Sequence, residues 1–133
     1  MDSNSKIYVA GNTGLVGSAI VRMLKRKGLN NILSSPSSHW DLRKQHDVDR
    51  FFEFNRPEYV FVAAAKVGGI MGNKNHPAEF IYDNLMIQSN IIDAAYRNGV
   101  KKLLFLGSSC IYPKSPKIPV SYTHLTLPTI CSV

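Results

Sequence analysis

Three glycines spaced three residues apart are the sequence feature most typical of a ligand site. Gly11, Gly14 and Gly17 directly follow the apolar run 6–10 and open a segment with helical periodicity. In a strand-turn-helix context, the first glycine permits a tight turn, the second lets the backbone approach a diphosphate, and the third allows close packing. The N-terminus of a helix also favours negative charge. We therefore expect a dinucleotide to bind at Gly11, Asn12, Thr13, Gly14, Leu15, Val16 and Gly17, with a glycine-rich turn that holds no ligand as the alternative.

The residues after the second apolar run bear on which nucleotide is bound. An acidic residue there binds the ribose of NAD, whereas an arginine favours the additional phosphate of NADP. Segment 34–39 contains serines and His39, and therefore neither residue type. These serines and His39 could bind a phosphate, although more weakly than an arginine would. His39 could equally be an ordinary solvated histidine. Asp41, followed by Leu42, could accept a hydrogen bond from an adenine amino group, or be the N-cap of the next helix.

Two further segments follow apolar runs that we expect to be strands. Small residues at Ala63, Ala64 and Ala65 would let a cofactor lie across the strand ends, although alanines also pack tightly for purely structural reasons. After the run 102–106, the segment Ser108-Ser109-Cys110 offers hydroxyl groups that could donate to a ketone as it becomes an oxyanion. A cysteine thiolate could remove a proton next to a carbonyl group. The alternatives are ordinary turn residues and a small buried thiol.

The elements that would position these residues alternate between strands and helices. Three of the four predicted strands are apolar throughout, which indicates a parallel sheet covered on both faces. Right-handed crossovers then predict an α/β fold with a Rossmann-like, doubly wound sheet that is truncated after about four strands. The expected strands are 6–10, 31–33, 59–63 and 102–106, the expected helices are 14–27, 47–55 and 77–97, and a loop is expected from Gly68 to Pro77.

Helical periodicity also predicts which side chains face inward. In the first helix, the expected inward face holds Leu15, Ala19, Ile20, Met23 and Leu24. In the second helix it holds Val48, Phe51 and Phe52, and in the third one stripe holds Ile81, Leu85, Gln88, Ile92 and Ala95.

Composition narrows the class of protein further. A length of 133 residues suits one domain, and no run approaches the roughly 20 apolar residues of a membrane span. The net charge of +7 comes from scattered basic residues, which argues against a nucleic-acid surface and suits ligands that carry phosphates. Two cysteines do not make a disulfide framework, and the N-terminus has no features of a secretory signal, so we expect a cytoplasmic protein.

Three long motifs resemble those of a known family. They are Ala63-Ala64-Ala65-Lys66-Val67-Gly68-Gly69-Ile70, then 77–82 followed by Asn84, and then 103–114, which includes Gly107-Ser108-Ser109-Cys110-Ile111-Tyr112-Pro113-Lys114. The chain resembles the GDP-L-fucose synthase family of extended short-chain dehydrogenase/reductases over about residues 6–119. Its G-x-x-G-x-x-G spacing is also the form used by that larger group. We expect 1–119 to be an NAD(P)-binding half-domain, and 120–133 to be a tail foreign to the family.

The resemblance implies an activity and a set of roles. The family inverts C3 and C5 of GDP-4-keto-6-deoxy-D-mannose and reduces C4 with NADPH, giving GDP-L-fucose. Ser108 matches the serine that bonds to the C4 oxygen, with Ser109 as the fallback, and Cys110 matches the acid/base cysteine of the epimerisation. Asn84 matches the helix asparagine that orders the site. The resemblance further implies NADP(H), with NAD(H) not excluded, a GDP-sugar substrate, and a homodimer without a nucleic-acid or membrane partner.

Several positions depart from the family pattern. Asn12 and Thr13 replace the usual histidine and arginine of the glycine turn, and no arginine follows the second strand. None of the six tyrosines begins the Tyr-x-x-x-Lys motif that reduction requires. We therefore expect a fragment that is inactive by itself, whose last strand presents an open edge that promotes association. The alternatives are a genuine short isoform, another nucleotide-sugar epimerase or dehydratase, and a non-catalytic dinucleotide-binding module.

Overall fold

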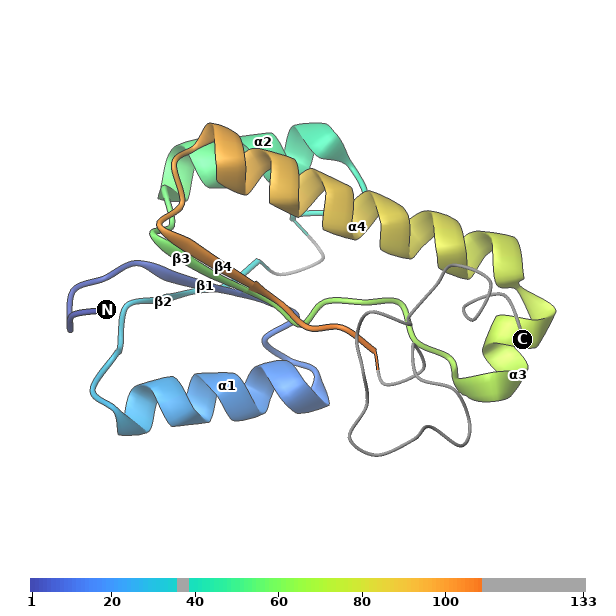
Figure 1. Cartoon of the computed structure of the whole chain (residues 1–133), viewed down its shortest axis with the longest axis horizontal. Coiled ribbons are helices and arrows are strands. Elements are labelled where there is room, and N and C mark those ends of the chain that lie inside the picture. The colour runs from blue at the N-terminus through green and yellow to red at the C-terminus, as the bar shows by residue number, and fades with distance from the viewer. Residues whose placement is uncertain (36–38, 109–133) are drawn as a thin grey trace, which may run out of the picture.

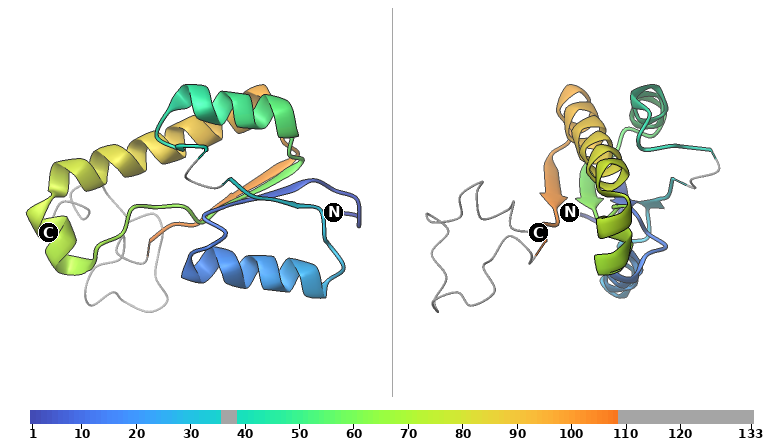
Figure 2. Two further views of the ribbon diagram at one scale, coloured as in Figure 1. Left: turned by 180° about the vertical axis from the view of Figure 1, so that it is seen from behind. Right: turned by 90° about the vertical axis from the view of Figure 1, so that its right-hand side faces the viewer.

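A four-stranded parallel sheet forms the centre of the structure, a computed structural model that describes residues 1–35 and 39–108. The sheet has α1 on one face and both α2 and α4 on the other (Figures 1 and 2). This arrangement confirms the predicted Rossmann-like α/β fold. The strands are β1 (Ile7–Ala10), β2 (Ile32–Leu33), β3 (Tyr59–Val62) and β4 (Lys102–Phe105), and the helices are α1 (Leu15–Arg26), α2 (Gln45–Asn55), α3 (Gly69–Asn75) and α4 (Pro77–Arg97).

The strand order β2-β1-β3-β4 places the first strand in the interior of the sheet. β1 pairs with β2 on one side and with β3 on the other, all in parallel, and Ile7 lies opposite Tyr59 and Ala10 opposite Val62. The chain therefore crosses one face to reach β2 and the other face to reach β3. In open α/β sheets, ligands bind where the direction of winding changes, outside the carboxyl ends of the strands. Here that point lies between β1 and β3.

Alternating side chains of β1 supply both halves of the core. Ile7 and Val9 pack with Leu24 beneath α1, whereas Tyr8 and Ala10 belong to the larger cluster beneath α2 and α4. All four residues of the strand are fully buried, as expected for a sheet covered on both faces.

An aromatic group fills the α2 side of the core. The ring of Tyr8 lies 4.5 Å from that of Phe51 and 5.8 Å from that of Phe52, and Trp40 packs edge-on against Phe51 at 5.6 Å. Tilted and edge-to-face pairs at these separations are the geometries that aromatic quadrupoles favour. The predicted inward residues of α2, Val48 among them, are buried as expected.

The inward face of α1 was predicted wrongly in part. Ile20 and Leu24 do pack on the sheet, but Leu15, Ala19 and Met23 are exposed. The cause is Gly17, which is buried and lets the helix approach the preceding turn. The buried stripe consequently consists of Gly17, Ile20, Val21 and Leu24, and hydrophobicity alone does not count a glycine as an inward residue.

Two predictions for the region 68–97 were also wrong. The expected loop contains α3, which forms in spite of two glycines because it packs against the start of α4; a Cβ atom at Gly72 would lie 3.3 Å from the Phe80 ring. In α4, Ala95 of the predicted stripe is buried, but Ile81, Leu85 and Ile92 are exposed. The buried face of α4 instead includes two polar residues, because both bond to neighbouring segments; this face holds Asp83, Asn90, Ile91, Ala94 and Ala95.

A matched pair of substitutions in α2 tests this packing. Phe52 is fully buried, whereas Phe54, two residues further along the same helix, is 83% exposed. Replacement of Phe52 by alanine should lower the free energy of unfolding by about 3–5 kcal/mol, because it removes apolar burial and leaves a cavity. The control Phe54→Ala should change it by less than about 0.5 kcal/mol in urea titrations. Equal effects of the two substitutions would contradict the placement of α2.

The edge of the sheet at β4 gives a second prediction. β4 pairs with β3 alone among the described residues, and Leu104, Phe105 and Leu106 are all more than a third exposed. Unpaired backbone groups beside apolar side chains promote association. The 133-residue chain should therefore elute in sizing chromatography above its monomer mass, and Leu104→Lys should raise the monomer fraction. A monodisperse wild-type monomer would refute this expectation.

Candidate functional site

The predicted glycine turn lies between the end of β1 and the start of α1. Gly11 has φ +79°, and a Cβ atom there would lie 2.8 Å from the Ala63 carbonyl oxygen and from the backbone of Ala64. Only glycine suits this position, because it tolerates both the backbone conformation and the contact. The N–H of Gly14 donates to the Gly11 carbonyl at 3.0 Å and closes the turn.

Gly17 brings the helix into direct contact with the same turn. A Cβ atom at Gly17 would lie 2.0 Å from the Gly11 carbonyl oxygen and 3.0 Å from the Cα atom of Asn12. The N-cap of α1 is Gly14, which offers no capping side chain, and the first turn holds no acidic residue. The first backbone N–H groups of a helix have no partner within the helix, so this end can accept an anion.

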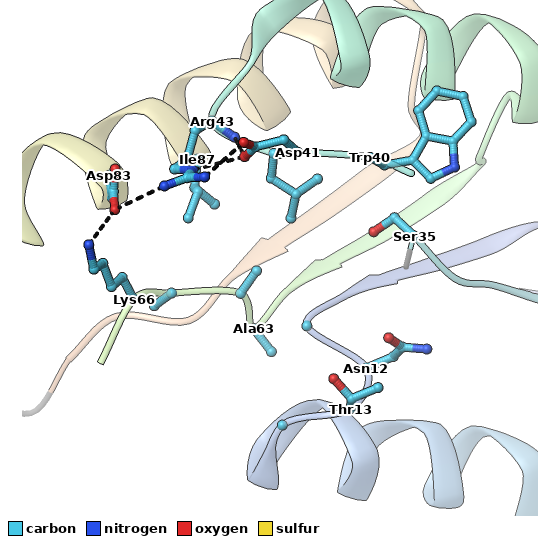
Figure 3. A pocket seen from close by; sticks show the side chains of 15 residues that line it. Asn12, Thr13, Ser35, Trp40, Asp41, Arg43, Ala63, Lys66, Asp83 and Ile87 are labelled. Carbon is cyan, nitrogen blue, oxygen red and sulfur yellow. Dashed lines mark hydrogen bonds and ion pairs between the residues drawn. The ribbon is translucent and has the colours of Figure 1, made fainter. Parts of the chain in front are cut away.

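The turn opens into a cavity of about 690 Å³ above the carboxyl ends of β1 and β3 (Figure 3). This volume is in the range of small-molecule and cofactor sites. The structure brings nine of the predicted residues to the cavity wall: Gly11, Asn12, Thr13, Gly14, Asp41, Leu42, Ala63, Ala64 and Ala65. Leu15, Val16, Gly17, Asn84 and Ser108 do not line it, and Leu15 is 88% exposed.

Four charged side chains form a row along one side of the cavity. The Arg43 guanidinium donates to both oxygens of Asp41, at 2.9 Å from Nε to Oδ1 and 2.8 Å from Nη2 to Oδ2. Its other nitrogen donates to Asp83 at 3.4 Å, and the Lys66 ammonium donates to the same Asp83 oxygen at 2.7 Å. Figure 3 shows the continuous chain of contacts from Asp41 through Arg43 and Asp83 to Lys66.

These ion pairs hold every member of the row in its charged form. The hydrogen bond from Arg43 lowers the pKa of Asp41 to about 2. The hydrogen bond from Lys66 lowers the pKa of Asp83, and the reciprocal bond raises the pKa of Lys66. The pKa of Arg43 is raised by its hydrogen bond to Asp41. A nearly buried carboxylate such as Asp83 requires such partners, because an unpaired buried charge is costly.

Asp41 does not cap a helix, so that alternative is wrong. α2 begins at Gln45 with Lys44 as its N-cap residue, three positions beyond Asp41. The Asp41 carboxylate instead accepts the backbone N–H of Arg43 at 3.0 Å in addition to the guanidinium. The side chain is therefore fixed at the cavity wall by its own loop.

Asn84 connects α4 to the chain that leaves β3. Its side-chain oxygen accepts the backbone N–H of Lys66 at 2.7 Å, and its side-chain nitrogen donates to the Lys66 carbonyl at 3.0 Å. The amide group thereby satisfies both backbone groups of one residue, much as a neighbouring strand would. The contact orders the segment that follows the three alanines.

The predicted catalytic residues fall at the limit of the described chain. Ser108 is exposed and follows the carboxyl end of β4, the same edge of the sheet as the glycine turn. Ser109 and Cys110 lie outside the described residues. His39 is exposed and is not among the residues that line the cavity.

Sequence reasoning missed several residues of the cavity wall. Trp40 comes from the loop after β2, and Arg43, Lys66 and Asp83 form most of the charged row. Ser35, one of the loop serines considered from the sequence, also lines the cavity. The sequence did contain a signal for two of the missed residues. Arg43 lies two positions after Asp41, and Lys66 directly follows the three alanines, so both are charged residues next to predicted site residues. The position of neither residue in the sequence identified their shared partner, Asp83, which lies on α4.

The described residues hold no group of three or more histidine, cysteine or acidic side chains that could bind a metal ion. Within 1–35 and 39–108, no helix is both long enough and apolar enough to span a membrane.

The sheet order and the glycine turn together define a Rossmann-like domain of the kind that binds dinucleotides. The chain belongs to the NAD dependent epimerase/dehydratase family, whose model matches residues 7–130.

Individual relatives are similar over nearly the whole chain. GDP-L-fucose synthase 1 from Arabidopsis thaliana is 56% identical over 124 residues, which are 93% of this chain and 38% of the relative. The structure of MlghC, a GDP-mannoheptose C4 reductase from Campylobacter jejuni with NADP bound, has 43% identity and a TM-score of 0.87, covering 94% of this chain and 40% of that one. A GDP-L-fucose synthetase from Naegleria fowleri bound to NADP has 32% identity and a TM-score of 0.80, covering 94% and 38%. The chain thus spans about two fifths of the length of these relatives.

The close contact at Gly17 can be tested by the substitution Gly17→Ala, which adds a single methyl group. Alanine is the better helix former by about 1 kcal/mol, so propensity alone predicts that Gly17→Ala stabilises the chain. We expect the opposite, a loss of about 1–3 kcal/mol, because the added carbon overlaps the Gly11 carbonyl. Urea unfolding followed by the fluorescence of Trp40, the single tryptophan, would measure it.

The neighbouring substitution Ser18→Ala is the control for this test. It removes a hydroxyl group whose two hydrogen bonds are exposed, so a change within about 0.5 kcal/mol is expected. A Gly17→Ala chain that is more stable than wild type would show that the helix does not lie against the turn.

Proposed function

We propose that this chain is the cofactor-binding part of an enzyme that converts GDP-4-keto-6-deoxy-D-mannose to GDP-L-fucose with NADPH. The observation that carries the proposal is the glycine turn, where a Cβ atom at Gly11 or Gly17 would overlap backbone. Such a turn leaves backbone N–H groups at the surface for a diphosphate. The 56% identity to GDP-L-fucose synthase 1 of Arabidopsis thaliana supports the particular substrate.

The residues present suit a nicotinamide dinucleotide. The glycine turn and the first amides of α1, from Leu15 to Gly17, would hold the diphosphate, because they combine a helix N-terminus with unhindered backbone. Asp41, ionised and at the cavity wall, would accept a hydrogen bond from the adenine amino group. Ala63, Ala64 and Ala65 would let the cofactor cross the strand ends. When bound, the dinucleotide supplies the hydride that reduces the C4 ketone.

The chain's own side chains would handle protons. Ser108 follows the carboxyl end of β4, where its hydroxyl could donate to the C4 oxygen as negative charge develops on it. Cys110, two residues further, would remove and return protons at C3 and C5, the carbons on either side of the C4 carbonyl. Ser109 is the alternative hydroxyl donor. Asn84 would act by ordering the segment after β3 through its two bonds to Lys66.

The proposal also assigns parts of the chain to the NAD(P)-binding unit, to a tail and to a dimer interface. Residues 1–119 would be the NAD(P)-binding part and 120–133 a tail outside it, in a cytoplasmic enzyme that binds a GDP-sugar. The 133 residues contain no Tyr-x-x-x-Lys, so reduction would require the enzyme with its substrate-binding half. The exposed apolar stripe of α4, which includes Ile81, Leu85 and Ile92, would contribute to a homodimer interface.

A second candidate function is reduction at C4 without epimerisation. The 43% identity and TM-score of 0.87 to MlghC, a GDP-mannoheptose C4 reductase, favour it. The two functions share the cofactor site and the serine, and they differ in whether a cysteine exchanges protons beside the ketone.

The experiment that separates them uses the full-length protein in D₂O with the keto sugar and NADPH. We expect deuterium at C3 and C5, oxidation of NADPH, and GDP-L-fucose as product. Cys110→Ser should reduce the deuterium exchange by a factor of at least about 100, because it removes the acid/base group. Ser18→Ala, which removes a hydroxyl group that lies outside the cavity wall, is the control and should change nothing.

Each remaining outcome has one meaning. NADPH oxidation without deuterium at C3 or C5 in the wild-type protein would favour the reductase. A wild-type protein that binds NADPH but neither oxidises it nor exchanges deuterium would refute both functions and leave a non-catalytic dinucleotide-binding module. A wild-type protein that does not bind NADPH would refute the dinucleotide site itself.

A further inference from the structure

One carboxylate of α4 holds two cations that come from different parts of the chain. The Asp83 side chain is 10% exposed, and one of its oxygens accepts both the Arg43 guanidinium at 3.4 Å and the Lys66 ammonium at 2.7 Å. Arg43 belongs to the loop after β2, whereas Lys66 follows β3. Withdrawal of either cation would leave a nearly buried charge short of partners, which is costly. Asp83 therefore fixes the positions of both segments relative to α4.

Lys66 has a second carboxylate partner, which holds it less firmly. The ammonium lies 3.3 Å from Glu79, whose side chain is 64% exposed. Ion pairs of exposed groups contribute little, because water screens them. Asp83 is both closer to the ammonium and far less exposed, so it is the main partner of Lys66. Glu79 lies one helical turn before Asp83 and thus offers a matched comparison.

Two amide side chains of α4 hold the backbone of the same segments. Asn84, next to Asp83, bonds to both backbone groups of Lys66. Asn90 donates to the Leu42 carbonyl at 3.1 Å. Positions 83 and 90 lie on one face of the helix, because seven residues make about two turns. Both segments of the cavity wall are therefore fastened to α4, and the Asp83 carboxylate contacts both.

The charged row connects positions that would meet different parts of a bound dinucleotide. Asp41, at one end, would meet the adenine, and Arg43 donates to both of its oxygens. Lys66, at the other end, directly follows the alanines that the cofactor would cross. Figure 3 shows the path of contacts between the two ends. A movement of Arg43 would change the pairing of Asp83 and thereby the position of Lys66, because the two cations share one carboxylate oxygen.

We propose that Asp83 is a positioning residue that couples the two ends of the cavity, so that a nucleotide bound against Asp41 also fixes the wall segment at Lys66. This inference rests on the proposed dinucleotide site, and it concerns the energetic coupling between parts of that site. When two positions act as one unit, damage at both weakens binding by less than the product of the separate effects.

A double-mutant cycle with the full-length protein measures the coupling. Asp41→Asn removes the charge at the adenine end, and Asn84→Ala frees the backbone of Lys66 at the other end. Each should weaken NADPH binding in titration calorimetry by about tenfold, and the double variant by only about thirtyfold, because the two ends are coupled. A double variant weakened by about a hundredfold, the product expected of independent sites, would overturn the proposal. A wild-type protein that does not bind NADPH would instead refute the dinucleotide site.

The substitution Asp83→Asn shows whether this residue carries the coupling. It keeps the shape of the side chain and removes the charge, and it should weaken NADPH binding by about tenfold. In this background the effects of Asp41→Asn and Asn84→Ala should multiply to about a hundredfold, because the link between the ends is lost. A merely structural role of Asp83 would weaken binding and leave the coupling as it is in the wild type. Coupling that survives Asp83→Asn would therefore overturn the assignment.

Two further variants complete the test. Glu79→Gln is the matched control, because it removes the exposed partner of Lys66; it should change NADPH affinity by less than about twofold and preserve the coupling. Lys66→Met removes the ion pair to Asp83 from its more exposed end, and it replaces Asp83→Asn if that variant does not fold. It should likewise abolish the coupling, and its failure to do so would count against the role of Asp83.

Discussion

The contact between Gly17 and the Gly11 carbonyl sets the geometry of the edge of the sheet where the cavity lies. Because no Cβ atom intervenes, the start of α1 lies directly on the turn that ends β1, and its N-cap residue, Gly14, lines the cavity. The same contact rotates the buried stripe of α1 onto Ile20, Val21 and Leu24. One contact therefore determines both how α1 packs on the sheet and where the N-terminus of α1 lies relative to the cavity.

The charged row on the far side of the cavity has a complementary role. Arg43 belongs to the loop after β2, Lys66 follows β3, and Asp83 lies on α4, so three separate elements meet at one carboxylate. Asn84 adds two hydrogen bonds to the backbone of Lys66. The glycine turn supplies the backbone half of the site, and these side chains hold the loops that form the remainder of its wall.

The sequence predicts the sheet, the glycine turn and the aromatic packing of α2 well, because each depends on local patterns. Gly11 to Gly17 and Val48, Phe51 and Phe52 are of this kind. The buried face of α4 was not predictable from hydrophobicity, because Asp83 and Asn90 are polar and are buried only through partners far along the chain. α3 was missed because its packing against Phe80 outweighs the poor helix propensity of its glycines. The hydrogen bond between the Tyr8 and Ser35 hydroxyl groups joins residues 27 positions apart, and no spacing rule connects them.

The two edge strands of the sheet, β2 and β4, differ in how well they could pair with another strand. β2 consists of only two residues, Ile32 and Leu33, and such a short strand is a poor template for another chain. β4 is twice as long and carries exposed Leu104 and Phe105. β4 is therefore the edge better suited to pair with a further strand, so growth of the sheet is favoured at that end.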